Sequence, residues 1–134
     1  MPEVEYQELR DRVIRENPFM TYNHIEVGPV RPDHAEVSMT ICRESTNIYH
    51  VVHGGAFFTM ADCCAGLCAR TDGRDYVTQD AAVQFIHNVS EGTVTARGSV
   101  LSRGKRICLV NVDITDQNGT LLFHGTVTMY CIRP

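Results

Sequence analysis

Residues 53–70 read HGGAFFTMADCCAGLCAR, and this stretch decides the fold. From Ala56 to Arg70 the composition favours a helix, with apolar side chains at nearly every angle around its axis. A helix that is apolar on all sides must be buried on all sides. The run Thr71-Asp72-Gly73 predicts its end. We therefore expect one central helix that the rest of the chain surrounds.

The segments around this helix alternate apolar and polar residues, which predicts strands. Long strands are expected after it at residues 76–89, 93–102, 107–115 and 121–131. Shorter ones are expected before it near residues 24–30 and 35–42, and residues 3–16 have the spacing of an amphipathic helix. The residues expected on the inner faces of the long strands are Val77, Ala81, Val83, Phe85, Val89, Val94, Ala96, Gly98, Val100, Cys108, Val110, Val112, Ile114, Leu121, Phe123, Val127, Met129 and Cys131.

Short turns such as Asn118-Gly119 make the successive strands antiparallel. Because one sheet is available to cover one buried helix, the sheet must curl around it, and a second copy of the chain is expected to cover part of what stays exposed. The expected fold class is α+β: a long antiparallel sheet wrapped around one central helix, with an extra N-terminal helix, which is the hotdog arrangement. Residues 1–134 are expected to form a single domain of this kind.

The composition excludes several classes of partner. Twelve Lys and Arg against sixteen Asp and Glu give a net charge of −4, which argues against nucleic acid. No apolar stretch is long enough to cross a bilayer, and the charged first residues lack the apolar core of a secretory signal. We expect a cytoplasmic protein without membrane attachment, whose six cysteines are free thiols.

The first candidate for chemistry is the start of the central helix, at His53-Gly54-Gly55. The first amides of a helix have no acceptor within the helix, and with the helix dipole they favour an anion or a polarised carbonyl oxygen. Such donors form an oxyanion hole when they face a reacting carbonyl. The same glycines would also suit a tight entry into the helix without any catalytic role.

The second candidate is Asp62, an acidic residue in the middle of the apolar helix. Ala65 and Gly66, one turn further on, leave space beside its carboxylate. A buried carboxylate without a partner is costly, so a catalytic role is favoured over a hydrogen bond to a nearby loop or a solvent-facing position.

The spacing of these two candidates restricts how they act together. Gly54 and Asp62 are eight residues apart, about 12 Å along a helix. A reacting carbonyl must lie within about 3 Å of both groups, so one chain cannot supply both to one centre. If both act, Gly54 of one subunit faces Asp62 of another across a two-fold axis.

The run Asn47-x5-His53-Gly54-Gly55-x6-Asp62 resembles the hotdog-fold acyl-CoA thioesterases, especially those of the phenylacetate-degradation type. The resemblance covers nearly the whole chain. It implies hydrolysis of acyl- or aryl-CoA thioesters to the free acid and CoA, without a metal or a cofactor. It also implies homodimers with shared active sites, which often pair into homotetramers.

The resemblance also implies roles for single residues. The Gly54 N–H would polarise the thioester carbonyl, and Asp62 would act as nucleophile or as general base on water. Asn47 would orient the water or the thioester, His53 would hold the loop beside it, and Thr78 would help to hold the water.

Other residues are candidates for binding the substrate. The turn Arg103-Gly104-Lys105-Arg106 is a basic cluster that would meet the CoA phosphates, although an ordinary solvated turn explains it equally well. Gly55, Phe57 and Phe58 follow the proposed oxyanion donor and would contact the acyl or aryl group, with core packing as the alternative for the aromatic rings.

Two rival functions remain open, and a metal site is not expected. A non-catalytic acyl-CoA-binding or sensor protein would keep the pocket without needing Asp62. A hotdog hydratase or dehydratase would need a His and a carboxylate in a different loop pattern. A metal site at His50 and His53, or at Cys64 and Cys68, lacks the second ligand pair of a standard zinc spacing, so no metal is expected.

Overall fold

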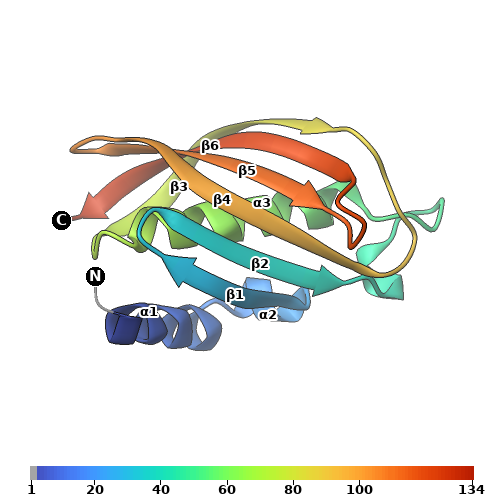
Figure 1. The fold of residues 1–134 in the computed structure, drawn as a ribbon, viewed down its shortest axis with the longest axis horizontal. Helices are drawn as coiled ribbons and strands as arrows, with labels where there is room; N and C mark the ends of the chain where they lie inside the picture. The colour runs from blue at the N-terminus through green and yellow to red at the C-terminus, as the bar shows by residue number, and fades with distance from the viewer. Residues whose placement is uncertain (1–2) are drawn as a thin grey trace.

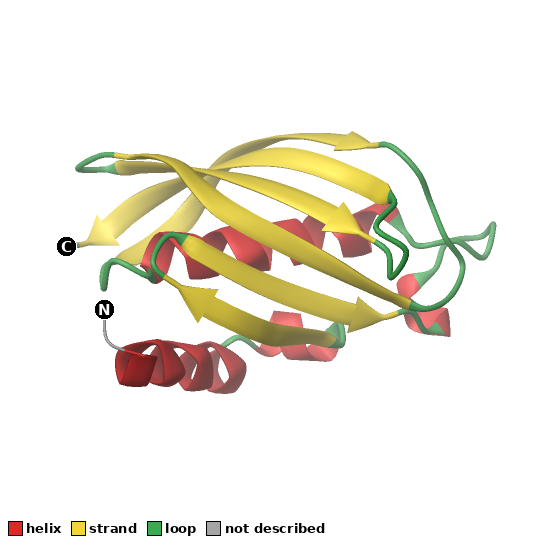
Figure 2. Cartoon of the chain, in the orientation of Figure 1, coloured by secondary structure: helices red, strands yellow, loops and turns green. Residues whose placement is uncertain are grey.

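The computed structural model describes residues 3–134. Its helices are α1 (Glu3–Glu16), α2 (Pro18–Tyr22) and α3 (Gly54–Arg70), with a 3₁₀ turn, η1, at Arg43–Ser45. The strands are β1 (Ile25–Arg31), β2 (His34–Thr40), β3 (Asp75–Phe85), β4 (Thr93–Arg103), β5 (Ile107–Thr115) and β6 (Leu121–Arg133). They form one antiparallel sheet in the order β1-β2-β4-β5-β6-β3, which curls around α3 (Figures 1 and 2). The expected α+β hotdog architecture is confirmed.

The core lies between α3 and the concave face of the sheet. Most expected inward residues of β4, β5 and β6 are buried, among them Val94, Ala96, Gly98, Cys108, Val110, Val112, Ile114, Phe123, Val127, Met129 and Cys131. α3 begins two residues earlier than expected, at Gly54, because the His53 side chain caps it. The short helix α2 was not expected; Asn17 caps it and Pro18 occupies its first position.

The expectation that α3 is buried on all sides is wrong for one stripe. Phe57, Met60 and Cys64 are buried against the sheet, but Phe58 is 40% exposed and Asp62 is only partly buried. The sheet of one chain does not reach around the whole helix. This open stripe is the part of α3 that carries the predicted catalytic carboxylate.

The prediction that Val77 faces the core at the start of β3 is wrong. Tyr76 is 2% exposed and Val77 is 47% exposed, the reverse of the expected alternation. Thr78 pairs with Met129 and Asp80 pairs with Thr128, so one extra residue, Gln79, forms a β-bulge. Beyond the bulge Ala81 and Val83 pack against the core as expected, and the strand ends at Phe85 rather than at residue 89.

A second bulge corrects the expected face of β6. Ile114 pairs with Phe123 and Thr115 pairs with Leu121, which leaves Leu122 as the extra residue. Leu122 is therefore fully buried, whereas Leu121, the expected core residue, is 39% exposed. An insertion of one residue moves the following side chains to the opposite face.

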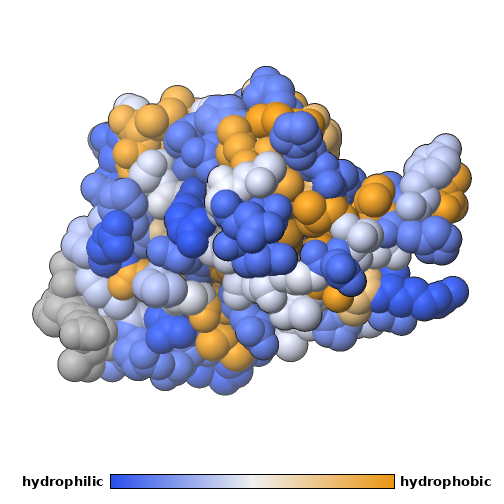
Figure 3. All heavy atoms as spheres, turned by 45° about the vertical axis from the view of Figure 1, so that its right-hand side comes forward, coloured by the Kyte–Doolittle hydropathy of each residue, from blue (hydrophilic) through white to orange (hydrophobic). Residues whose placement is uncertain are grey.

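The surface of the described chain includes an unpaired strand edge and a protruding loop (Figure 1). β3 lies at one end of the strand order, so its outer edge has no neighbouring strand within residues 3–134. The loop between β2 and α3 extends beyond the end of the sheet (Figure 1). In the view of Figure 3 hydrophilic residues cover most of the surface, with apolar residues in small groups between them. Across residues 3–134, no helix has the length and apolar character needed to cross a membrane.

Candidate active site

A groove of about 670 Å³ runs along the open stripe of α3. From α3 it is lined by Gly55, Phe58, Thr59, Asp62, Cys63, Gly66 and Arg70. Its other walls come from Asn17 and Phe19 at α2, from Tyr76, Val77 and Thr78 of β3, and from Met129 of β6. Three of the predicted substrate or catalytic side chains, those of Phe58, Asp62 and Thr78, therefore share one groove.

Asp62 and Thr78 are in direct contact. The Thr78 hydroxyl donates a hydrogen bond of 2.5 Å to Asp62 Oδ1. This contact depends on the bulge at Gln79, because strict alternation from Ala81 and Val83 would turn Thr78 away from α3. A carboxylate held by a hydroxyl on one oxygen keeps its other oxygen for a water or a carbonyl carbon.

Cys63 is the other reactive side chain beside Asp62. Burial, together with the charge of Asp62, raises the pKa of the Cys63 thiol to about 12. At neutral pH the group is therefore a thiol rather than a thiolate, and only the thiolate is an effective nucleophile. Asp62 is the better candidate for attack or for proton transfer in this groove.

Three of the first four amides of α3 already have acceptors, and the remaining one, that of Gly54, is the candidate oxyanion donor. The Gly55 N–H donates to His53 Nδ1 at 2.8 Å, and the Ala56 and Phe57 amides donate to the His53 carbonyl. No acceptor is recorded within residues 3–134 for the Gly54 N–H. Because His53 Nδ1 accepts, the proton of the neutral ring lies on Nε2.

Gly54 and Asp62 lie on the same straight helix, about 12 Å apart along its axis. Within one chain the structure does not bring the two groups to one centre. Gly54 lies instead beside β3, where an added Cβ would meet the Phe85 ring at 3.3 Å. The two groups can act on one carbonyl only if they come from different chains.

The structure places the other residues predicted to contact the thioester in three different environments: Asn47 in a loop, Phe57 in the core and Phe58 in the groove. The side-chain oxygen of Asn47 accepts from the Tyr49 and Val51 amides at 2.9 and 3.4 Å, so it stabilises the loop before α3. Phe57 is buried in the core, with its ring centroid 6.3 Å from that of Phe123. Of the two predicted aromatic contacts, Phe58 is the one in the groove.

The cations of the basic turn after β4 differ in whether they have carboxylate partners among residues 3–134. Lys105 and Arg106 are exposed. The Arg103 guanidinium instead donates to Asp33 Oδ1 at 2.8 Å and to Asp72 Oδ2 at 2.7 Å. It also donates to the Ala69 and Cys68 carbonyls at 2.9 and 3.1 Å. Arg103 thus caps the C-terminal end of α3.

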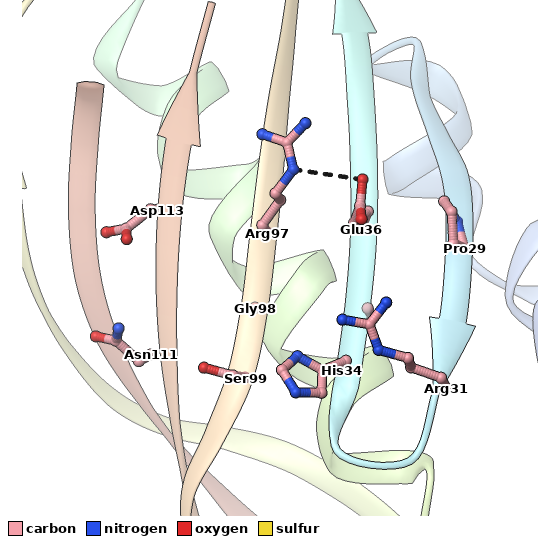
Figure 4. A pocket seen from close by; sticks show the side chains of 10 residues that line it. Pro29, Arg31, His34, Glu36, Arg97, Gly98, Ser99, Asn111 and Asp113 are labelled. Atoms are coloured by element: carbon pink, nitrogen blue, oxygen red, sulfur yellow. Dashed lines mark ion pairs between the residues drawn. The ribbon is translucent and has the colours of Figure 1, made fainter. Parts of the chain in front are cut away.

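A second depression, of about 290 Å³, lies on the far face of the sheet. Figure 4 shows that Arg31, His34, Arg97 and Asp113 project over it from different strands, with Glu36 paired to Arg97 at 3.6 Å. It carries charges of both signs, and none of the predicted site residues lines it. Among residues 3–134, no group of three or more His, Cys, Asp or Glu side chains could hold a metal ion.

Residues 49–123, more than half of the chain, match the family model of the thioesterase superfamily. The chain belongs to the thioesterase superfamily. The matched range includes the start of α3, Asp62 and Thr78, whereas the groove walls at Asn17, Phe19 and Met129 lie outside it.

Individual members of the superfamily support the same assignment. The acyl-coenzyme A thioesterase PaaI of Escherichia coli is 28% identical over 94 residues, which are 68% of this chain and 67% of that protein. A hypothetical thioesterase of Streptococcus pneumoniae, solved with coenzyme A, has a TM-score of 0.78 and 29% identity over 81% of this chain and 89% of that chain. A thioesterase of Haemophilus influenzae reaches a TM-score of 0.86 over 96% of this chain and 90% of that chain; at 22% identity it supports the fold alone.

The Streptococcus pneumoniae thioesterase has also been solved as two alanine variants. One replaces an aspartate and the other a threonine, and the two positions are sixteen residues apart. Both variant structures are 28% identical to this chain over 82% of its length.

Proposed function

We propose that this protein hydrolyses acyl-CoA thioesters to the free acid and CoA, at sites shared between two subunits. In each site Asp62 of one subunit acts on a thioester whose carbonyl oxygen accepts from the Gly54 N–H of the other. The observation that carries the proposal is the Asp62 carboxylate, held by Thr78 in an open groove, in a chain of the thioesterase superfamily.

Two comparisons add support for this substrate and these residues. One superfamily member named above is an acyl-coenzyme A thioesterase, and another has been solved with coenzyme A. In the second protein the replaced aspartate and threonine have the same spacing, sixteen residues, as Asp62 and Thr78.

The unpaired edge of β3 supports the participation of a second subunit. An exposed edge strand offers a row of unpaired amides and carbonyls to another chain. β3 offers eleven residues, with the exposed apolar side chains Val77 and Phe85 along it and Ile86 just beyond. Pairing two copies of β3 about a two-fold axis would bring the open stripes of two α3 helices towards each other. We propose this homodimer as the smallest active unit, and a tetramer of two such dimers as the assembled form.

The proposed reaction proceeds in two steps. With Asp62 as general base, the carboxylate takes a proton from a water whose oxygen attacks the thioester carbonyl carbon. The carbonyl electron pair moves to the oxygen, and the resulting oxyanion accepts from the Gly54 N–H. The carbonyl then re-forms, the carbon–sulfur bond breaks, and the CoA sulfur leaves with the proton from Asp62. His53 fixes the start of α3 through the Gly55 amide, and Asn47, whose side-chain oxygen holds the loop before α3, is proposed to orient the water or the thioester.

With Asp62 as nucleophile, its oxygen attacks the thioester carbonyl carbon, the carbon–sulfur bond breaks, and CoA leaves as a thiolate that takes a proton from solvent. Water then hydrolyses the resulting mixed anhydride, which releases the free acid and restores the Asp62 carboxylate. A single turnover in ¹⁸O-labelled water tests for the anhydride. Label in the Asp62 carboxylate identifies an anhydride that water attacks at the aspartyl carbon; label in the acid product alone is the result of the general-base version and of attack on the acyl carbon of an anhydride.

The cations proposed for the CoA phosphates are Lys105 and Arg106, because both are exposed at the β4–β5 turn. Arg103, which was predicted to join them, has its guanidinium engaged by Asp33, Asp72 and the end of α3. Its role towards phosphate stays a prediction.

The test of this function is hydrolysis across a panel of acyl-CoA thioesters, followed by loss of thioester absorbance. A thiol reagent is unsuitable because the protein has six cysteines of its own. Turnover of at least one thioester is expected. Binding of CoA esters without turnover would favour a sensor protein, and hydration of an enoyl-CoA would favour a hydratase.

Replacement of Gly54 with proline tests the oxyanion donor. Proline removes the N–H yet suits the first position of a helix, and His53, with φ −66° and ψ 136°, has the extended backbone that proline requires of its predecessor. We expect kcat to fall by about 10²–10³-fold, measured with the best thioester of the panel.

Gly54→Ala is the matched control for this variant. It adds the same Cβ against Phe85 but keeps the N–H. We expect it to retain most of the wild-type kcat. Equal activity of the proline and alanine variants would contradict the role of the Gly54 amide.

A further inference from the structure

Arg70, the last residue of α3, is a cation in the groove that the proposed reaction does not use. An arginine at this position of a helix ordinarily lies near the last carbonyls. Here Arg103 already donates to the Cys68 and Ala69 carbonyls. The Arg70 side chain instead runs back along the helix towards Asp62.

Gly66 provides the space for this arginine. A Cβ at position 66 would lie 2.5 Å from Arg70 Nη1, closer than real contacts allow. Glycine inside a helix costs about 1 kcal/mol relative to alanine, so helix stability does not explain it. Gly66 is one turn beyond Asp62 and lines the same groove. The guanidinium therefore occupies a recess in the groove floor, one turn from the carboxylate.

The charge of Arg70 is poorly compensated within the described chain. Over residues 3–134 its one recorded hydrogen bond runs from Nη2 to the Tyr76 carbonyl, at 3.0 Å. The nearby Asp75 is already paired with Arg12 at 3.0 Å and with Arg133 at 3.1 Å. Burial, together with the positive charge of Arg12, lowers the pKa of Arg70 by more than Asp75 and Asp62 raise it. A guanidinium has five donors and recognises carboxylates in a two-pronged geometry.

We propose that Arg70 binds a carboxylate at the far end of the acyl group, so that the preferred substrates are CoA monothioesters of short dicarboxylic acids. One helical turn is about 5.4 Å, and each carbon–carbon bond is about 1.5 Å. The matching acyl groups carry their carboxylate three or four bonds beyond the thioester carbonyl, as succinyl and glutaryl groups do. This inference rests on the proposed thioester hydrolysis.

The test compares glutaryl-CoA with pentanoyl-CoA, which has the same number of acyl carbons and no distal charge, after subtraction of spontaneous hydrolysis. In the wild type we expect kcat/KM for glutaryl-CoA to be at least about tenfold higher. Arg70→Met should remove this preference, because kcat/KM falls by a larger factor for glutaryl-CoA than for pentanoyl-CoA. Gly66→Ala should weaken the preference without removing the charge, because the new methyl displaces the guanidinium.

Arg97→Met, a change on the far face of the sheet, is the control and should keep the preference. A wild type with higher kcat/KM for pentanoyl-CoA would overturn the inference. An equal fold-loss of kcat/KM for both thioesters in Arg70→Met would also overturn it. Neither result contradicts thioester hydrolysis. If no thioester is hydrolysed, the proposed function fails, and calorimetric binding of the two CoA esters to wild type and Arg70→Met decides the inference alone. Tighter glutaryl-CoA binding that depends on Arg70 supports it, and equal binding of the two esters overturns it.

Discussion

Replacement of Asp62 with asparagine is expected to lower kcat on the best acyl-CoA thioester by about 10³-fold, whether the carboxylate serves as base or as nucleophile. Asparagine has nearly the same shape, and its side-chain oxygen can still accept from Thr78. The groove and its substrate affinity should therefore persist. The measurement is steady-state hydrolysis by thioester absorbance, with CoA ester binding and oligomeric state determined on the same samples.

Asp80→Asn is the matched control for this prediction. Asp80 is an exposed carboxylate on β3, two residues from Thr78, and it does not line the groove. Its variant should hydrolyse thioesters like the wild type. An Asp62→Asn protein that keeps more than about a tenth of the wild-type kcat would remove Asp62 from the reaction.

The second large effect is on stability, at Arg103. Its side chain is 21% exposed and joins Asp33, Asp72, Tyr76 and two carbonyls of α3. Replacement by methionine would leave a mostly buried Asp72 carboxylate and the helix carbonyls without this donor. We expect a loss of about 3 kcal/mol in the free energy of unfolding, measured by urea denaturation at fixed protein concentration.

Lys105→Met, an exposed change in the same turn, should shift the unfolding free energy by less than about 0.5 kcal/mol. If the two variants were equally stable, the capping role of Arg103 would be wrong.

The same cluster predicts a pH dependence of stability. Burial raises the pKa of Asp72. Hydrogen bonds from Tyr76 and Arg74 and the charge of Arg103 lower it by more, so the pKa of Asp72 is below its usual value. In acid the unfolded chain then binds a proton that the folded chain does not. This contribution to stability is present above about pH 4 and is lost as the pH falls through the folded pKa. The loss should be smaller in Arg103→Met.

The architecture can be predicted from the sequence because the spacing of apolar residues indicates each helix and strand. An apolar helix and alternating strands are local patterns, and the helix start and the carboxylate within it can be read directly from 53–70. The bulges cannot be read in this way. Gln79 and Leu122 become extra residues because of the register of the neighbouring strand, and that register is a property of the whole sheet.

The consequences of the bulges reach the site itself. The family resemblance implies that Thr78 helps to hold the water, but the bulge at Gln79 sets the direction of its side chain towards Asp62. Arg103 looks like a phosphate ligand in a basic turn because its partner Asp33 is seventy residues away. Arg70 looks like an ordinary basic residue at a helix end until Arg103 is known to cap that end. Contacts between segments that are distant in the sequence determine the roles of Thr78, Arg103 and Arg70, and these contacts cannot be read from local sequence patterns.

The claim that one site takes Gly54 from one subunit and Asp62 from another is tested most directly by mixing two inactive variants. Gly54→Pro and Asp62→Asn chains are co-expressed so that subunits associate at random, and hydrolysis is compared with either variant alone. In a mixed dimer the Asp62→Asn chain supplies an intact Gly54 and the Gly54→Pro chain an intact Asp62, which restores one of two sites. Half of the dimers are mixed, so the account predicts recovery of about a quarter of wild-type activity. Activity no higher than that of the separate variants would contradict it.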